Sequence, residues 1–242
     1  MRKLIIIPLI VFFSIDAFSQ KFDWIKSIGD TMSQYGNKII QDSIGNMYMS
    51  GAFSGKMEFV SGNPLYTLNS TSGNSVFLNK ADSLGNFIWI KEIISNNLIS
   101  VTDLILDNNF NLFMSINYKG TVDVDPGPSQ KIITNSTNYF YSAIIKFDSA
   151  GNFIWVKEFK GNINILNIKI DKQFNIIHCG YFKSADFDPG FSTYNKSSQG
   201  SSDGFVSKLD SSGNFLWVKS FWSYGFSGPG WVLTGLLQID NQ

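Results

Sequence analysis

The sequence is poor in the residues that most often carry chemistry. It has one cysteine, Cys179, and one histidine, His178, which exclude an intrachain disulfide and a Cys/His zinc site. Its single arginine, Arg2, lies at the N-terminus, so we expect no bidentate arginine recognition of carboxylates or phosphates. No phosphate-binding glycine-rich loop is present, and no motif such as a Gly-x-Ser-x-Gly elbow surrounds His178. We therefore predict no catalytic residues and no enzyme.

Charged residues are also scarce. They make up 16% of the chain, and 19 Lys+Arg against 19 Asp+Glu give a net charge of zero. This balance excludes the basic footprint of a nucleic-acid-binding protein. A hydrophobic fraction of 43%, with 15% aromatic residues, excludes an acidic disordered chain. The composition therefore predicts a folded protein with no nucleic-acid partner, and it leaves the oligomeric state open.

A long apolar run occurs only at the N-terminus. Met1-Arg-Lys3 precedes the ten apolar residues Leu4–Phe13, and Ala17 and Ser19 then supply small side chains. This order is typical of a secretory signal peptide, and the run is shorter than the roughly 20 residues that span a bilayer. The alternative is a short N-terminal membrane anchor. We predict a signal peptide at residues 1–19 and a secreted or cell-surface protein with no membrane insertion after signal removal.

An aromatic segment recurs four times along the chain. It reads Phe-x-Trp-[Ile/Val]-Lys, and successive tryptophans are 65, 66 and 62 residues apart: Trp24, Trp89, Trp155 and Trp217. Asp-Ser-x-Gly-Asn precedes three copies, and related Asp-x-x-[Gly/Phe]-Asn motifs begin at Asp42, Asp107 and Asp171. Asp hydrogen-bonds the backbone two residues on, and Gly tolerates positive φ, so both motifs predict hairpin tips. Simple alternation predicts that Phe, Trp and Lys share one face of the aromatic strand.

Each repeat of about 64 residues then contains four strands. They are expected near 37–42, 46–53, 75–81 and 87–93, near 101–107, 111–117, 140–147 and 153–159, and near 165–171, 175–182, 204–210 and 215–221. We therefore predict an all-β fold, a β-propeller-like array of four-stranded antiparallel blades. It has three complete blades plus partial terminal strands, which make an incomplete ring.

The repeats also define the predicted domain organisation. The propeller region covers 20–242, with repeats at about 22–86, 87–152 and 153–214 and a partial one at 215–242. Lone strands are expected at Phe22–Lys26 and Val232–Asp240. Because propellers need about four to eight blades, we expect the chain to be truncated at its C-terminus.

Longer stretches of the repeat resemble a known family. Gly180–Gly190, with the sequence GYFKSADFDPG, is followed by Asp203–Lys219, and Thr121–Gly127 repeats the middle of the first stretch. These segments resemble the SBBP-type β-propeller repeats of secreted and surface proteins of the Bacteroidetes and similar bacteria. The resemblance covers nearly all of the mature chain. It implies a propeller fold and export, and it implies no particular activity.

Paired aspartates are the best candidates for a metal site. Asp123 and Asp125 recur as Asp186 and Asp188 in two Asp-x-Asp-Pro-Gly segments. Carboxylates at i and i+2 share one side of a strand, and Ca²⁺ prefers such oxygen ligands. The alternative is a Pro-Gly turn whose aspartates orient the loop through backbone hydrogen bonds. No cofactor other than this calcium is expected.

The remaining candidates have structural explanations. The tryptophans suit packing between blades, with a sugar-stacking surface as the alternative, and Cys179 suits a buried small side chain. The preferred function is a non-catalytic propeller that serves as a binding or scaffold module for a protein or polysaccharide. Its rim would consist of the variable segments near 54–74, 118–138 and 183–203. The alternative is a propeller-fold hydrolase or lyase that uses repeated acids such as Asp123 and Asp186.

Overall fold

The structure is a computed structural model that describes residues 28–29, 33–60 and 66–221. The predicted signal peptide and both lone terminal strands lie outside these residues. Within them, no helix has the length and apolar character needed to cross a bilayer. The strands are β1 (Gln34–Gln41), β2 (Met47–Glu58), β3 (Thr67–Ala81), β4 (Phe87–Ser95), β5 (Ile99–Leu106), β6 (Leu112–Tyr118), β7 (Gly120–Asp123), β8 (Ile132–Asn135), β9 (Tyr141–Phe147), β10 (Phe153–Phe159), β11 (Gly161–Ile170), β12 (Ile176–Asp186), β13 (Asn195–Ser197), β14 (Asp203–Leu209) and β15 (Phe215–Phe221).

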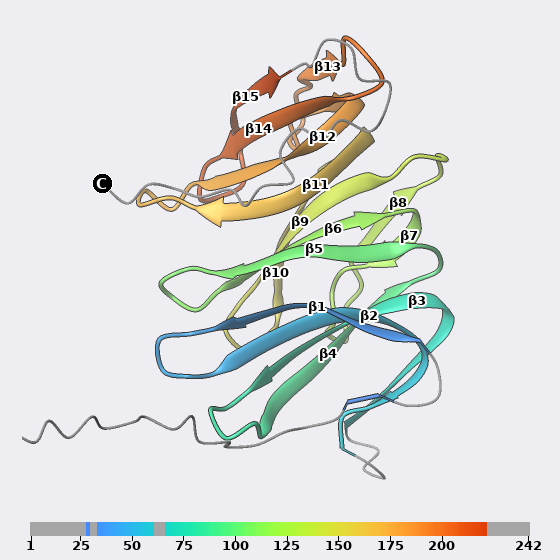
Figure 1. The fold of residues 1–242 in the computed structure, drawn as a ribbon, viewed down its shortest axis with the longest axis vertical. Coiled ribbons are helices and arrows are strands. Elements are labelled where there is room, and N and C mark those ends of the chain that lie inside the picture. Colours follow the sequence, from blue (N-terminus) through green and yellow to red (C-terminus); the bar gives the residue numbers. More distant parts are fainter. Residues whose placement is uncertain (1–27, 30–32, 61–65, 222–242) are drawn as a thin grey trace, which may run out of the picture.

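Twelve of these strands form three antiparallel four-stranded units. Their orders are β1-β2-β3-β4 (blade 1), β5-β6-β9-β10 (blade 2) and β11-β12-β14-β15 (blade 3). The blades stack face to face in chain order, with blade 2 in the middle (Figure 1). This is the arrangement of neighbouring propeller blades, and it confirms the predicted fold and the twelve predicted strands.

In the described part of the chain, two of the three buried hydrophobic clusters lie between blades, and the third belongs to blade 1 alone. Leu78 of blade 1 packs with Leu104 and Met114 of blade 2 in one fully buried cluster. Ile144 of blade 2 packs with Ile165 of blade 3 and its neighbours in a second cluster. A single four-stranded sheet would leave both faces in water, so stacking removes this apolar surface from solvent.

All six Asp-x-x-[Gly/Phe]-Asn motifs form the predicted tips, on the left of Figure 1. In one of them, Asp148 Oδ1 accepts hydrogen bonds from the backbone N–H of Ala150 and Asn152, both at 2.9 Å. Its Oδ2 accepts from Asn152 Nδ2, also at 2.9 Å, and Gly151 has a φ of 77°. The same bonds recur at the tips that begin at Asp42, Asp82, Asp107, Asp171 and Asp210. We call this side of the molecule the turn edge.

The aromatic strand differs from its predicted pattern. Phe153 pairs with Phe147 and Trp155 with Lys146, so Ile154 is an extra, unpaired residue. The same bulge occurs in β4 and β15. A bulge reverses the alternation of faces, so Phe153 packs into the core between blades 1 and 2, and Trp155 into the core between blades 2 and 3. The prediction that Phe and Trp share one face is therefore wrong.

The long connections lie at the opposite side, which we call the connection edge (right in Figure 1). The connection of blade 2 contains the hairpin β7–β8, and β7 pairs with the outer strand β4 of blade 1. That of blade 3 contains β13, which pairs with β12. Val122, Val124 and Phe187 in these connections are fully buried. In blades 2 and 3, the predicted variable rim (118–138 and 183–203) therefore consists of anchored segments, of which the loop tips are exposed.

Candidate functional site

The Asp-x-Asp-Pro-Gly loops are fixed by their own aspartates. Asp123 Oδ1 accepts hydrogen bonds from the N–H of Asp125 at 3.2 Å and of Lys131 at 2.9 Å. Asp125 Oδ1 accepts from the N–H of Gly127 at 2.8 Å. One carboxylate thus joins the two arms of the loop, and the next closes the Pro-Gly turn.

The same geometry is repeated in blade 3. Asp186 Oδ1 accepts from the N–H of Asp188 at 3.0 Å and of Tyr194 at 2.7 Å, and Asp188 Oδ1 accepts from Gly190 at 2.8 Å. These bonds are the ones that the turn alternative requires. Among the described residues, no group of three or more His, Cys, Asp or Glu could hold a metal ion. Calcium binding by the four aspartates stays a prediction.

Large apolar side chains of the long connections are exposed to solvent. Phe191 directly follows an Asp-Pro-Gly turn and is fully exposed. Tyr194 and Ile132 are nearly half exposed, and Tyr139 is 55% exposed. The ring of Tyr194 also packs on that of Phe215, with centroids 4.9 Å apart. Hydrogen bonds thus fix the backbone of the Asp-Pro-Gly loops, one of which carries the exposed Phe191.

Two of the three tryptophans that the structure describes, Trp89 and Trp155, lie at blade boundaries. Trp89 of blade 1 donates its Nε1–H to the carbonyl oxygen of Ser149 in a turn of blade 2, at 3.3 Å. A Cβ on Gly151 in the same turn would lie 3.3 Å from the Trp89 ring, so glycine permits this close approach. Trp155 packs between blades 2 and 3, and Trp217 is 39% exposed. Trp89 and Trp155 therefore join neighbouring blades.

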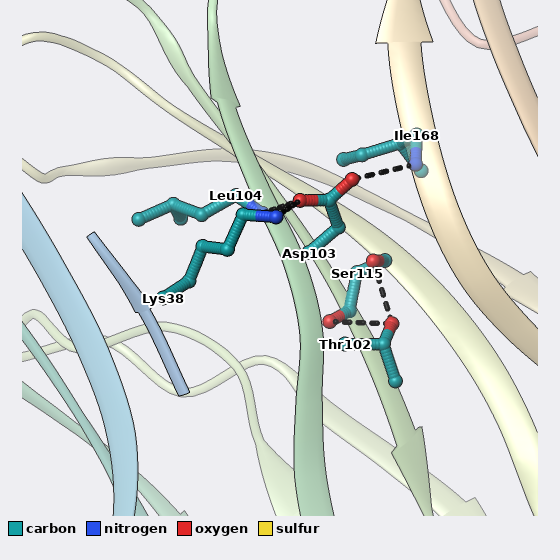
Figure 2. Close-up of polar contacts among 6 residues, drawn as sticks. All are labelled: Lys38, Thr102, Asp103, Leu104, Ser115 and Ile168. Atoms are coloured by element: carbon teal, nitrogen blue, oxygen red, sulfur yellow. Dashed lines mark hydrogen bonds and ion pairs between the residues drawn. The ribbon is translucent and has the colours of Figure 1, made fainter. Parts of the chain in front are cut away.

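A buried carboxylate joins all three blades (Figure 2). Asp103 on β5 is 1% exposed; its Oδ1 forms an ion pair with Lys38 Nζ on β1 at 2.8 Å. Its Oδ2 accepts a hydrogen bond from the backbone N–H of Ile168 on β11 at 3.0 Å, and Oδ1 also accepts from the N–H of Leu104. The sequence analysis missed Asp103. The available signal was a single acid inside the apolar strand Ile99–Leu106.

A second polar junction connects blades 2 and 3. Asn117 Nδ2 donates to the carbonyl oxygen of Ile165, and the N–H of Ile165 donates back to Asn117 Oδ1, both at 3.2 Å. Ser142 Oγ donates to Asn117 Oδ1 at 2.6 Å and also lies 3.1 Å from the Ile165 nitrogen. These buried groups are mutually satisfied, so they fix how the two blades align.

His178 and Cys179 are both buried, as adjacent residues on the opposite faces of β12. His178 is packed between the rings of Phe159 and Phe205, and neither ring nitrogen has a hydrogen-bond partner among the described residues. Burial lowers the pKa of His178 to about 3 and raises that of the Cys179 thiol. Both groups are therefore neutral at physiological pH, and the structure places them in the core rather than at a reactive surface.

The three stacked blades with tight tips on one edge define a β-propeller-like repeat protein. No family model matches the chain. Over 89 residues, which are 36% of this chain, the sequence is 34% identical to an uncharacterized WD repeat-containing protein of Acanthamoeba polyphaga mimivirus. The chain spans 6% of the length of that relative. The match agrees with a propeller-like repeat.

Proposed function

We propose that this chain is a non-catalytic propeller module that binds a protein partner along its connection edge, outside the cell or on its surface. The observation that carries the proposal is the exposed Phe191 on a loop held by Asp186 and Asp188. Aromatic anchors dominate the binding energy of protein interfaces, and loops fixed before binding lose little conformational entropy. Rigid scaffolds that present variable loops are a common way to build recognition surfaces.

The sequence supports the finer parts of this proposal. The predicted signal peptide at residues 1–19 favours export, and the resemblance to SBBP-type repeats of the Bacteroidetes favours the same location. The absence of disulfides suits a module held together by its buried core. Asp123 and Asp186, the acids of the hydrolase or lyase alternative, each accept two backbone hydrogen bonds, which suits a structural role.

Site-specific cross-linking tests the protein-binding edge. A photoreactive amino acid replaces Phe191, and the variant is expressed in the cells that produce the protein. Irradiation should then cross-link the variant to one protein of defined mass. The matched control carries the same amino acid in place of Leu84, an exposed apolar residue on the turn edge, and should give no such product. Phe191→Ser should then weaken binding of the purified partner by about tenfold or more, with Leu84→Ser unchanged. Equal products at the two positions, or equal affinity of the two variants, would refute the proposed edge.

A further inference from the structure

A trough crosses the turn edge between blades 2 and 3. The tip that joins β5 to β6 and the tip that joins β11 to β12 line two hollows of about 220 and 260 Å³. Both hollows are lined by Asp107, Ile170 and Phe174, so these three residues are shared by the two hollows. The trough is formed by hairpin tips, whereas the long connections begin at the opposite ends of the strands.

Phe174 is an unusual residue for its position. It has a φ of 62°, where four of the six tips carry glycine, and its side chain is 47% exposed. A left-handed backbone disfavours a residue with a Cβ, and an exposed aromatic ring adds little to folding there. Phe110 has the same backbone, with a φ of 60°, but does not line either hollow. Of the two tips that carry phenylalanine at the left-handed position, only the tip of Phe174 places that residue in the trough. The partly exposed Phe174 ring therefore offers a flat apolar surface to a ligand there.

An open ion pair lies beside this ring. Lys146 Nζ and Asp107 Oδ2 are 3.9 Å apart, too far for a direct hydrogen bond. The equivalent atoms of Lys208 and Asp171 in blade 3 are 2.7 Å apart. Lys146 and Asp107 both line the larger hollow. One hydroxyl group would close the gap, because it can donate to the carboxylate and accept from the ammonium.

The charges that line the trough are balanced. Asp107 and Asp171 contribute two negative charges, and Lys146 and Lys172 contribute two positive ones. An anion would meet the carboxylates and a cation the ammonium groups, so the lining favours a neutral ligand. The side-chain amides of Asn108 and Asn109 add donors and acceptors for further hydroxyl groups.

We propose that this trough binds a sugar ring of a neutral oligosaccharide. The C–H face of the ring packs on Phe174, and one hydroxyl group bridges Asp107 and Lys146. A few placed polar groups beside an apolar surface are the usual composition of a small-ligand site. The inference goes beyond the proposed function, because it adds a glycan site on the edge opposite the protein-binding loops.

Ligand-observed NMR tests this site directly. The protein is screened by saturation transfer against neutral tetrasaccharides of glucose, mannose, galactose and N-acetylglucosamine, and we expect at least one to bind. Phe174→Gly should weaken that binding at least tenfold. Phe110→Gly also places glycine at a left-handed tip position, and it should leave the sugar binding unchanged. Lys146→Met should weaken binding several-fold. Lys80→Met, at the equivalent position of blade 1, should not.

Two results would overturn the inference. One is that none of the four tetrasaccharides binds to the wild-type protein. The other is that Phe174→Gly and Phe110→Gly bind with equal affinity. The cross-linking at position 191 separates this site from the protein-binding edge, because Phe174→Gly should leave that cross-link intact and Phe191→Ser should leave sugar binding intact.

Discussion

Asp171 shows how one carboxylate fixes a hairpin tip. Its Oδ1 accepts the N–H groups of Gln173 and Asn175, both at 2.9 Å, while its Oδ2 accepts from Asn175 Nδ2 and from Lys208 Nζ. Burial acts to raise the pKa of Asp171, but the hydrogen bonds from Lys208, Asn175 and Gln173 together lower it to about 2. The Asp171 carboxylate is therefore charged at neutral pH, where it can accept all four hydrogen bonds.

The stabilisation by Asp171 should depend on pH. Because its folded pKa of about 2 lies below the ordinary 3.8, its contribution is complete above about pH 4 and disappears as the pH falls towards 2. Asp171→Asn should lower the free energy of unfolding by about 1–3 kcal/mol at pH 7. Urea unfolding at several pH values should show this difference shrinking between pH 4 and pH 2. A difference that stays constant over that range would contradict the assignment.

His178 should destabilise the protein in mild acid. Its folded pKa of about 3 is below the ordinary 6.5, so only the unfolded chain takes up a proton between these values. His178→Met places there the residue found at the equivalent Met114 of blade 2, and it should stabilise the protein by about 1 kcal/mol at pH 7. The advantage of the variant should grow by about 1.5 kcal/mol between pH 6.5 and pH 5 in chemical unfolding. An advantage independent of pH would show that His178 is not buried as described.

At the scale of the strand, glycine permits the close approach of β11 and β12. A Cβ on Gly180 would lie 1.9 Å from the carbonyl oxygen of Asn164. Gly180→Ala should therefore force the strands apart and lower the free energy of unfolding by about 2–3 kcal/mol. Gly200→Ala is the control, because a Cβ there meets nothing within 4 Å and its effect should be within about 0.5 kcal/mol. Equal melting temperatures for the two variants would be inconsistent with the register of β11 and β12.

The first strand of each blade has an equivalent position after a bulge, and in blade 2 this position is Asp103. Lys38, Asp103 and Asn167 each follow a bulge and pair with Ser50, Ser115 and Cys179. Asp103→Ala removes the partner of Lys38 and leaves the buried N–H of Ile168 without an acceptor. It should lower the free energy of unfolding by about 3 kcal/mol. Lys38→Met should cost less, because Lys38 is partly exposed and Asp103 keeps its two backbone donors.

The strands and tips were predictable because their signals are local. Asp at the first position and Gly at the left-handed position carry enough information to place each hairpin, as Asp148 and Gly151 show. The bulges at Ile88, Ile154 and Leu216 were not predictable, because an unpaired residue changes the register without changing the pattern of apolar residues. The aromatic strand was therefore predicted at the correct residues, but its Phe and Trp side chains were wrongly assigned to the same face.

The candidate sites were less predictable, because they depend on contacts between blades. Asp103 has no motif around it, and only the stacking of β1, β5 and β11 shows why a charge is buried there. Phe174 was visible as a departure from Gly in the tip motif, but the trough beside it needs the tip of the neighbouring blade. Short strands such as β7 and β13 lie in segments rich in Pro, Gly and Ser, which favour turns.

For the whole molecule, stacking separates two edges of different composition. The turn edge consists of tips that carboxylates and asparagines fix, and the connection edge carries exposed aromatic residues on anchored loops. On the face of blade 1 away from blade 2, a hollow of about 450 Å³ is lined by Met49, Met57, Phe77 and neighbouring residues. A core that lies between blades makes each blade depend on its neighbour for stability.

Amide hydrogen exchange of the wild-type protein and Asp103→Ala tests this dependence most directly. If the three blades form one cooperative stack, the slowest amides of β2, β6 and β12 should all lose protection by the same factor in the variant. That factor should match the loss in free energy of unfolding. Faster exchange confined to β5 and β6, with β2 and β12 unchanged, would contradict the account, because the blades would then be independent sheets rather than parts of one propeller-like core.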